Sequence, residues 1–163
     1  TTYVATGLAA GSIAAMASGE VDWCICFEPG LTTPTMTGVA YAPFTLRGGD
    51  GPDALAWPSL VRTTSRSLTE TAPNLVRHYS AAGVEATAWM RDNRDEAIVK
   101  VAEYLTAGDA ELAAALYDNN IASLSTTGLL DRAGIENNIA YALGRGIIAE
   151  TMSFDDVAVN LED

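Results

Sequence analysis

Residues Ala14 to Pro29, AAMASGEVDWCICFEP, decide how the rest of the chain is interpreted. A run of small residues typical of a helix leads into a Gly-Glu-Val-Asp turn, and an apolar run then ends at Glu28 and Pro29. Val21 to Phe27 is too short for most helices, so it predicts a strand buried on both faces, as in a parallel sheet. Ligands of open α/β sheets lie just beyond the carboxyl ends of the strands. The stretch therefore predicts a binding cleft beside Glu28.

The composition is that of a folded protein with a large acidic excess. The chain has 163 residues, of which 48% are apolar, and a net charge of −12. This length and apolar content suffice for one domain with a core. The acidic charge argues against nucleic acid and anionic membranes as partners, because both attract basic patches. It fits a soluble protein of an extracytoplasmic or crowded compartment. The sequence contains neither a secretory signal nor an apolar run of about 18 residues, so no membrane span is expected.

Strand patterns come first along the chain, and helix patterns follow. The expected strands are Tyr3–Thr6, Val21–Phe27, Val39–Tyr41 and Trp57–Thr64, and within Thr32–Tyr41 a short helix is expected ahead of the third strand. The expected helices are Ala9–Ala17, Pro73–Asp92, Arg94–Thr106, Ala110–Asn119 and Leu129–Leu143, with a last short turn or helix that starts at Ser153. The first strand, helix and strand form a βαβ unit, so the expected fold class is α/β. Helices on one side only would leave an apolar face of the sheet bare, which another part of the same protein or a second copy would cover.

Local signals fix several of the expected helix ends. Asn93 followed by Glu96 is a capping-box pattern, and Asp109 is expected to cap the helix that follows it. The apolar residues of the Pro73–Asp92 helix recur at helical spacing and predict core positions. They are Leu75, Val76, Tyr79, Val84, Trp89 and Met90.

The two cysteines, Cys24 and Cys26, lie on the expected strand. Residues two apart on a strand face the same side but are too stretched to bridge without strain. We therefore expect two small buried apolar side chains. A metal site would need two more soft ligands nearby, and His78 is far away in sequence, so no metal is expected. No motif for a cofactor, a nucleophile or a phosphate is present, and neither a cofactor nor a catalytic residue is expected.

The candidate ligand contacts each have two interpretations. Glu28 is either a solvated loop carboxylate or a partner for a cationic ligand group. Gly11 and Ser12 are either simple turn residues or part of a helix start whose N–H groups bind an anion. Phe27 and Trp57 either line a pocket or belong to the core.

Three segments resemble one family in its own order along the chain. They are GSIAAMASGEVDWCICFEP (11–29), TETAPNLVRHYSAAGVEATAWMRDNRDEA (69–97) and the stretch 129–156 that ends in GRGIIAETMSFDD. Together they resemble substrate-binding proteins of ABC transporters, of the nitrate, sulfonate and taurine group and of its pyrimidine-precursor relatives. The resemblance implies the carboxy-terminal half of a two-lobed fold of the type II periplasmic-binding kind. Residues 1–56 would end one lobe and include the crossover, and residues 57–163 would form the returning strand and helices of the other.

The resemblance also implies a function and a site. Ligand contacts of this half would fall near Gly11 and Ser12 and near Glu28 and Pro29, where taurine-type members hold the amine of the ligand with an acidic residue. The chain would be a solute-binding component of an ABC importer and would bind a small organic molecule without converting it. Its partner would be the transporter permease. It would be located in the periplasm or outside the cell, and a lipid anchor could attach it to the membrane. Cys24 and Cys26 depart from the Ala or Val usual in this strand.

The residues are also compatible with two other functions. One is a sensory effector domain on the same fold, which a neighbouring DNA-binding domain would identify. The other is an enzyme of pyrimidine-precursor synthesis, for which the Cys24-x-Cys26 pair is the only hint. A fragment that folds alone is expected to hide its bare sheet face by self-association.

Overall fold

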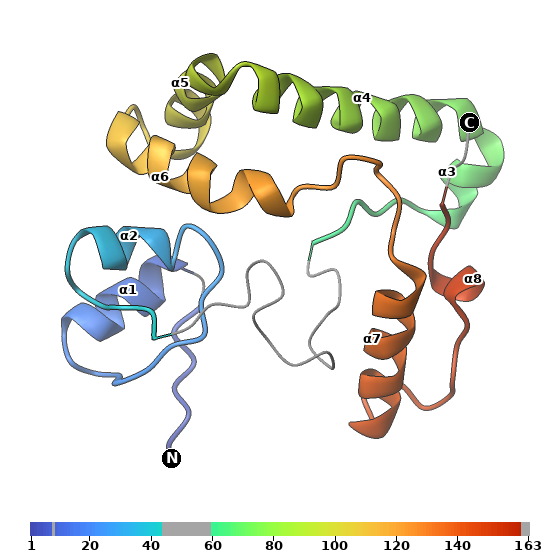
Figure 1. Ribbon diagram of the computed structural model, residues 1–163. Helices are drawn as coiled ribbons and strands as arrows, with labels where there is room; N and C mark the ends of the chain where they lie inside the picture. The colour runs from blue at the N-terminus through green and yellow to red at the C-terminus, as the bar shows by residue number, and fades with distance from the viewer. Residues whose placement is uncertain (8, 44–59, 161–163) are drawn as a thin grey trace. The chain divides into compact units, whose positions relative to one another are not determined.

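The computed structural model describes residues 1–7, 9–43 and 60–160, and these are helical wherever they have regular structure (Figure 1). The chain divides into two compact units. Unit 1 comprises Thr1–Thr45 and Met90–Ser123, and unit 2 comprises Leu46–Trp89 and Leu124–Asp163. The boundary at residues 56 and 57 expected from the resemblance lies outside the described residues, and that division stays a prediction.

Unit 1 is organised around a helical hairpin formed by α5 (Arg94–Leu105) and α6 (Ala110–Asn120). Small residues at the contact, Ala97, Ala102 and Ala113, are buried and let the two helices approach closely. The connection turns sharply because Ala107 and Gly108 have φ values of 52° and 93°. The N–H of Gly108 donates to the Ala102 carbonyl at 2.8 Å, which closes the end of α5.

Two further helices complete the regular structure of unit 1. Helix α1 (Ala9–Ala17) is followed by Gly19, which has a φ of +75° and donates its N–H to the Met16 carbonyl at 3.1 Å. Helix α2 (Thr32–Met36) packs against α6, and its residues Thr32 and Pro34 are among the most completely buried of the described chain. A single-turn helix, η3 (Ile121–Ser123), continues α6.

Unit 2 contains α3 (Arg66–Thr71), most of α4 (Pro73–Asp92), α7 (Arg132–Gly144) and α8 (Phe154–Val157). Helix α8 packs against α7, and the side chain of Phe154 is only 2% exposed. The expected helices at Ala9–Ala17 and Pro73–Asp92 are confirmed with the same bounds, and α5, α6 and α7 differ from expectation by a few residues. Helix α3 was not expected. Ser65 begins it, since its hydroxyl accepts a hydrogen bond from the Leu68 N–H at 3.2 Å.

The α/β prediction is wrong for the part of the chain that the structure describes. Tyr3–Thr6, Val21–Phe27 and Val39–Tyr41 form no strand there, and neither do the described residues 60–64 of the fourth expected strand. A strand is stable only when a partner satisfies its backbone groups, and no described segment pairs with any of these. The Val21–Phe27 run is also exposed rather than buried, with Ile25 97% and Trp23 75% exposed.

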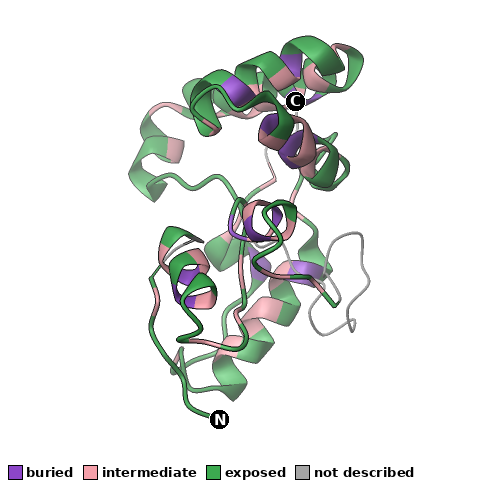
Figure 2. Cartoon of the chain, turned by 90° about the vertical axis from the view of Figure 1, so that its left-hand side faces the viewer, coloured by how far each residue is buried: buried purple, intermediate pink, exposed green. Residues whose placement is uncertain are grey.

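Much of the described chain is exposed (Figure 2). Many large apolar residues are among the exposed ones. On α4 the expected core positions Leu75, Tyr79 and Trp89 are 58%, 67% and 40% exposed, so that core prediction is wrong for these three. Their spacing is helical, but spacing does not say which neighbour covers the apolar side of a helix. Among the helices of the described residues, none combines the length and the apolar character that a bilayer crossing requires.

Candidate functional site

The strongest candidate site is a hydrogen-bonded chain of Glu28, Thr32 and Asn119 in unit 1. The Thr32 N–H donates to one carboxylate oxygen of Glu28 at 3.1 Å, and the Thr32 hydroxyl donates to the other at 2.9 Å. The Asn119 amide, from α6, donates to the Thr32 hydroxyl oxygen at 2.9 Å. Thr32 is only 2% exposed and Glu28 is half-buried. Hydrogen bonds in such a chain polarise one another, so the carboxylate is held in a fixed orientation.

This chain of bonds fixes the position of Glu28. Glu28 lies just before α2. There its negative charge stabilises the N-terminus of the helix. Carboxylates pair with cationic groups such as an amine or a guanidinium. By its chemistry, the arrangement therefore suits a cationic group.

Sequence reasoning missed both partners of Glu28. Thr32 follows Glu28 by four residues, a spacing that could have indicated a bond at a helix start. Asn119 is 87 residues from Thr32, and no local pattern signals that contact.

Asn119 follows Asp118, whose carboxylate forms an ion pair with Arg94 of α5. The Arg94 guanidinium donates to both carboxylate oxygens of Asp118, at 2.9 and 2.7 Å, and its carbon lies 5.7 Å from the Tyr117 ring centre. The hydrogen bond to Asp118 raises the pKa of Arg94 above its usual value. The Tyr117 hydroxyl in turn donates to the Met90 carbonyl at 2.6 Å. These contacts fix α6, and so the position of Asn119.

Gly11 and Ser12 lie within the first half of α1. A Cβ on Gly11 would collide with the carbonyl oxygen of Thr6, so only glycine fits there. The Ser12 hydroxyl is 6% exposed and shares a hydrogen bond of 2.8 Å with that of Thr6. A hollow of about 360 Å³ lies beside them, lined by Thr6, Gly11 and their neighbours up to Glu20. Close packing thus accounts for both residues, and their expected contact with an anion stays a prediction.

The remaining expected contacts do not gather around Glu28 in one described pocket. Phe27 is 68% exposed, and its carbonyl accepts a bond from the Gly30 N–H at 2.7 Å. Pro29 is exposed, and its carbonyl accepts from the Thr33 N–H at 3.0 Å. Trp57 lies outside the described residues. Phe27 and Pro29 therefore form the turn that leads into α2.

The cysteine prediction is wrong. Cys24 and Cys26 form a disulfide, with their Cα atoms 5.9 Å apart, and both are half-buried. The segment is not a fully stretched strand, so the Cα separation falls within the range that disulfides require. Because the loop that the bridge closes has only three residues, chain entropy gives it a stabilisation of about 1.6 kcal/mol, well below that of bridges across long loops.

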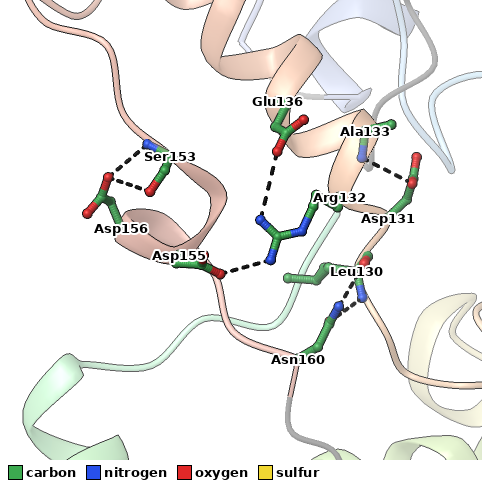
Figure 3. Close-up of polar contacts among 9 residues, drawn as sticks. All are labelled: Leu130, Asp131, Arg132, Ala133, Glu136, Ser153, Asp155, Asp156 and Asn160. Atoms are coloured by element: carbon green, nitrogen blue, oxygen red, sulfur yellow. Dashed lines mark hydrogen bonds and ion pairs between the residues drawn. The ribbon is translucent and has the colours of Figure 1, made fainter.

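Unit 2 holds a second polar cluster, between α7 and α8 (Figure 3). The Arg132 guanidinium donates to Asp155 at 2.9 Å, lies 3.8 Å from Glu136, and stacks 4.2 Å from the centre of the Phe154 ring. Asn160 exchanges two hydrogen bonds with the backbone of Leu130, at 2.7 and 3.0 Å. The contacts of Arg132 with Asp155 and Phe154 join α7 to α8, so the cluster explains how α8 is held.

Comparison with protein-family models, with curated proteins and with solved structures finds no match to this chain. Within residues 1–7, 9–43 and 60–160, no group of three or more His, Cys, Asp or Glu side chains is placed to hold a metal ion.

Proposed function

We propose that this chain binds a small organic molecule that carries a cationic group, as a solute-binding component of an ABC importer. The observation that carries the proposal is the half-buried Glu28 carboxylate, which Thr32 and Asn119 hold in place. A preoriented carboxylate favours an amine or guanidinium because little freedom is lost when the two groups pair. The proposal concerns the ligand and leaves aside the α/β architecture, which the described residues lack.

The charge around Glu28 along the chain supports a cationic ligand. Residues 1–43 contain no Lys, Arg or His, and their acidic side chains are Glu20, Asp22 and Glu28. With a net charge of −12 for the whole chain, the electrostatic field attracts cations and repels anions. Among ligands of the resembling group, this favours those that carry an amine.

The partner and the location are part of the same proposal. Importer components of this kind work outside the cytoplasm and deliver their ligand to a permease. The Cys24–Cys26 disulfide supports an extracytoplasmic location, since disulfides persist in oxidising compartments. Self-association of the fragment stays a prediction.

Calorimetry with two matched ligands tests the proposal. Taurine carries an amine, and 2-hydroxyethanesulfonate replaces that amine with a hydroxyl group. We expect the chain to bind taurine and related amines at least tenfold more tightly than their hydroxyl analogues. A Glu28→Gln variant should lose most of that preference, because a hydrogen bond to a charged group contributes about 1.5–3 kcal/mol.

The control is Glu85→Gln, which neutralises an exposed carboxylate on α4 in unit 2. It changes the net charge by the same amount and should leave binding as it is. Circular dichroism of both variants checks that the helices remain. Equal affinity of the Glu28→Gln variant and the unaltered chain for amines would refute the assignment.

A further inference from the structure

The Cys24–Cys26 disulfide lies in a non-helical segment between α1 and α2, among exposed side chains. Trp23 and Ile25, on either side of Cys24, are 75% and 97% exposed, and both cysteines are half-buried. Exchange at a disulfide requires that a thiolate approach one of the sulfurs. The disulfide is therefore accessible to a thiol in solution.

The bridge does not hold distant parts of the chain together. It joins residues only two apart, and hydrogen bonds outside it fix the segment at both ends. On the α1 side, the Glu20 and Val21 N–H groups donate to the Ala15 carbonyl at 2.9 and 3.3 Å. On the α2 side, the Gly30 N–H donates to the Phe27 carbonyl at 2.7 Å. Opening the disulfide breaks none of these bonds.

We propose that Cys24 and Cys26 form a reversible redox pair whose disulfide is reduced by an external dithiol. One thiolate of the dithiol attacks a cysteine sulfur, the Cys24–Cys26 bond breaks, and the other cysteine leaves as a thiolate that takes up a proton. The second thiol of the reductant then attacks the mixed disulfide and releases the first cysteine. The protein disulfide gains two electrons and two protons, and the dithiol loses the same and becomes a disulfide.

The closeness of the two cysteines explains why a dithiol is needed. In a mixed disulfide between one cysteine and a single thiol, the other cysteine lies close by and expels that thiol again, so a single thiol reduces the pair slowly. A dithiol overcomes this because its second thiol resolves the mixed disulfide within one molecule.

The first experiment treats the native chain with dithiothreitol, blocks free thiols with N-ethylmaleimide and counts the adducts by intact mass. We expect no adduct before reduction, two adducts after it, and full return of the disulfide when the reductant is removed and oxidised glutathione is added. The helical circular dichroism should stay constant throughout. Reduction only in urea, loss of helix on reduction, or two adducts without reductant would each overturn the proposal.

The second experiment uses the variants Cys24→Ser and Cys26→Ser with oxidised glutathione. Each variant keeps one thiol and should accumulate a stable glutathione adduct, because the second cysteine that expels glutathione is absent. In the unaltered chain, reduced first, the adduct should be at least tenfold less abundant, since the neighbouring thiol displaces it. An equally abundant adduct in the unaltered chain would show that the cysteines do not act as a pair. Both outcomes are independent of ligand binding at Glu28.

Discussion

At the scale of single residues, carboxylates in the described chain serve to begin helices. Asp109 accepts the Leu112 N–H at 2.9 Å, and Asp131 accepts the Gly134 N–H at 2.9 Å. Glu28 does the same for Thr32 at the start of α2. Negative charge is favourable at a helix N-terminus, where backbone N–H groups lack partners. Part of the acidic excess is therefore explained by local structure.

Asp156 gives a prediction at this scale. Its carboxylate accepts the Ser153 hydroxyl at 2.7 Å and the Ser153 N–H at 2.8 Å (Figure 3). The bond from the Ser153 hydroxyl, helped by the one from its N–H, lowers the pKa of Asp156. Since the pKa is lower in the folded chain, this contribution to stability is present above the ordinary pKa of an aspartate and is lost as the pH falls through the lowered value. We expect α8 to loosen only in that acid range.

Carboxyl ¹³C chemical shifts measured from pH 7 to pH 2 would follow this titration. The Ser153→Ala variant removes the hydroxyl donor and keeps the backbone donor, so the pKa of Asp156 should rise toward its ordinary value. The Ser125→Ala variant, in a loop earlier in unit 2, should leave the titration of Asp156 unchanged. An unaltered pKa in Ser153→Ala would mean that the hydroxyl bond contributes nothing.

At the scale of elements, the helical hairpin of α5 and α6 is the best-specified part of the chain. The sequence predicted its helices, its Gly108 turn and its Asp109 cap, and the structure confirms them. The capping box expected at Asn93 and Glu96 is not formed, because the Asn93 side chain makes no capping bond at α5. The box found at Ser153 and Asp156 begins α8 instead. Ser153 has the extended backbone conformation that a capping residue needs, and Asn93 does not. The same sequence pattern therefore forms a capping box at α8 and none at α5.

Removal of the Asp109 cap should destabilise the hairpin. We expect Asp109→Ala to lower the free energy of unfolding of unit 1 by about 1 kcal/mol, because the Leu112 N–H then loses its partner. Urea denaturation followed by circular dichroism would measure the loss. Asp109→Asn is the matched control and should keep most of the stability, since asparagine caps nearly as well. If both variants lose the same amount, the charge and not the cap would be responsible.

At the scale of the whole molecule, the acidic excess dominates the electrostatics. The chain has 21 acidic and nine basic residues, and the resulting self-repulsion opposes folding. Ion pairs such as Arg94–Asp118 and Arg132–Asp155 act in the opposite direction but are exposed and therefore weak.

Salt should therefore stabilise the chain. Raising the ionic strength from 0.01 M to 1 M shortens the screening length from about 30 Å to about 3 Å. We expect Tm to rise by a few degrees as repulsion is screened, with sodium and potassium chloride giving the same result. Differential scanning calorimetry would measure the change. A Tm that falls with salt would show that the exposed ion pairs outweigh the repulsion, and a difference between the two salts would indicate specific binding of an ion.

The sequence by itself determined most of the helices, the Asp109 cap and the acidic charge. These are local or additive properties: a cap forms within about four residues, and charges sum without regard to the fold. Tertiary structure decided the bond between Thr32 and Asn119 across 87 residues, the burial of Phe154 and the exposure of the Val21–Phe27 run. An apolar run becomes a strand only where another segment pairs with it, and that pairing depends on which distant residues the fold brings alongside. For the same reason the residues around Glu28 emerged only from the packing of α2 against α6.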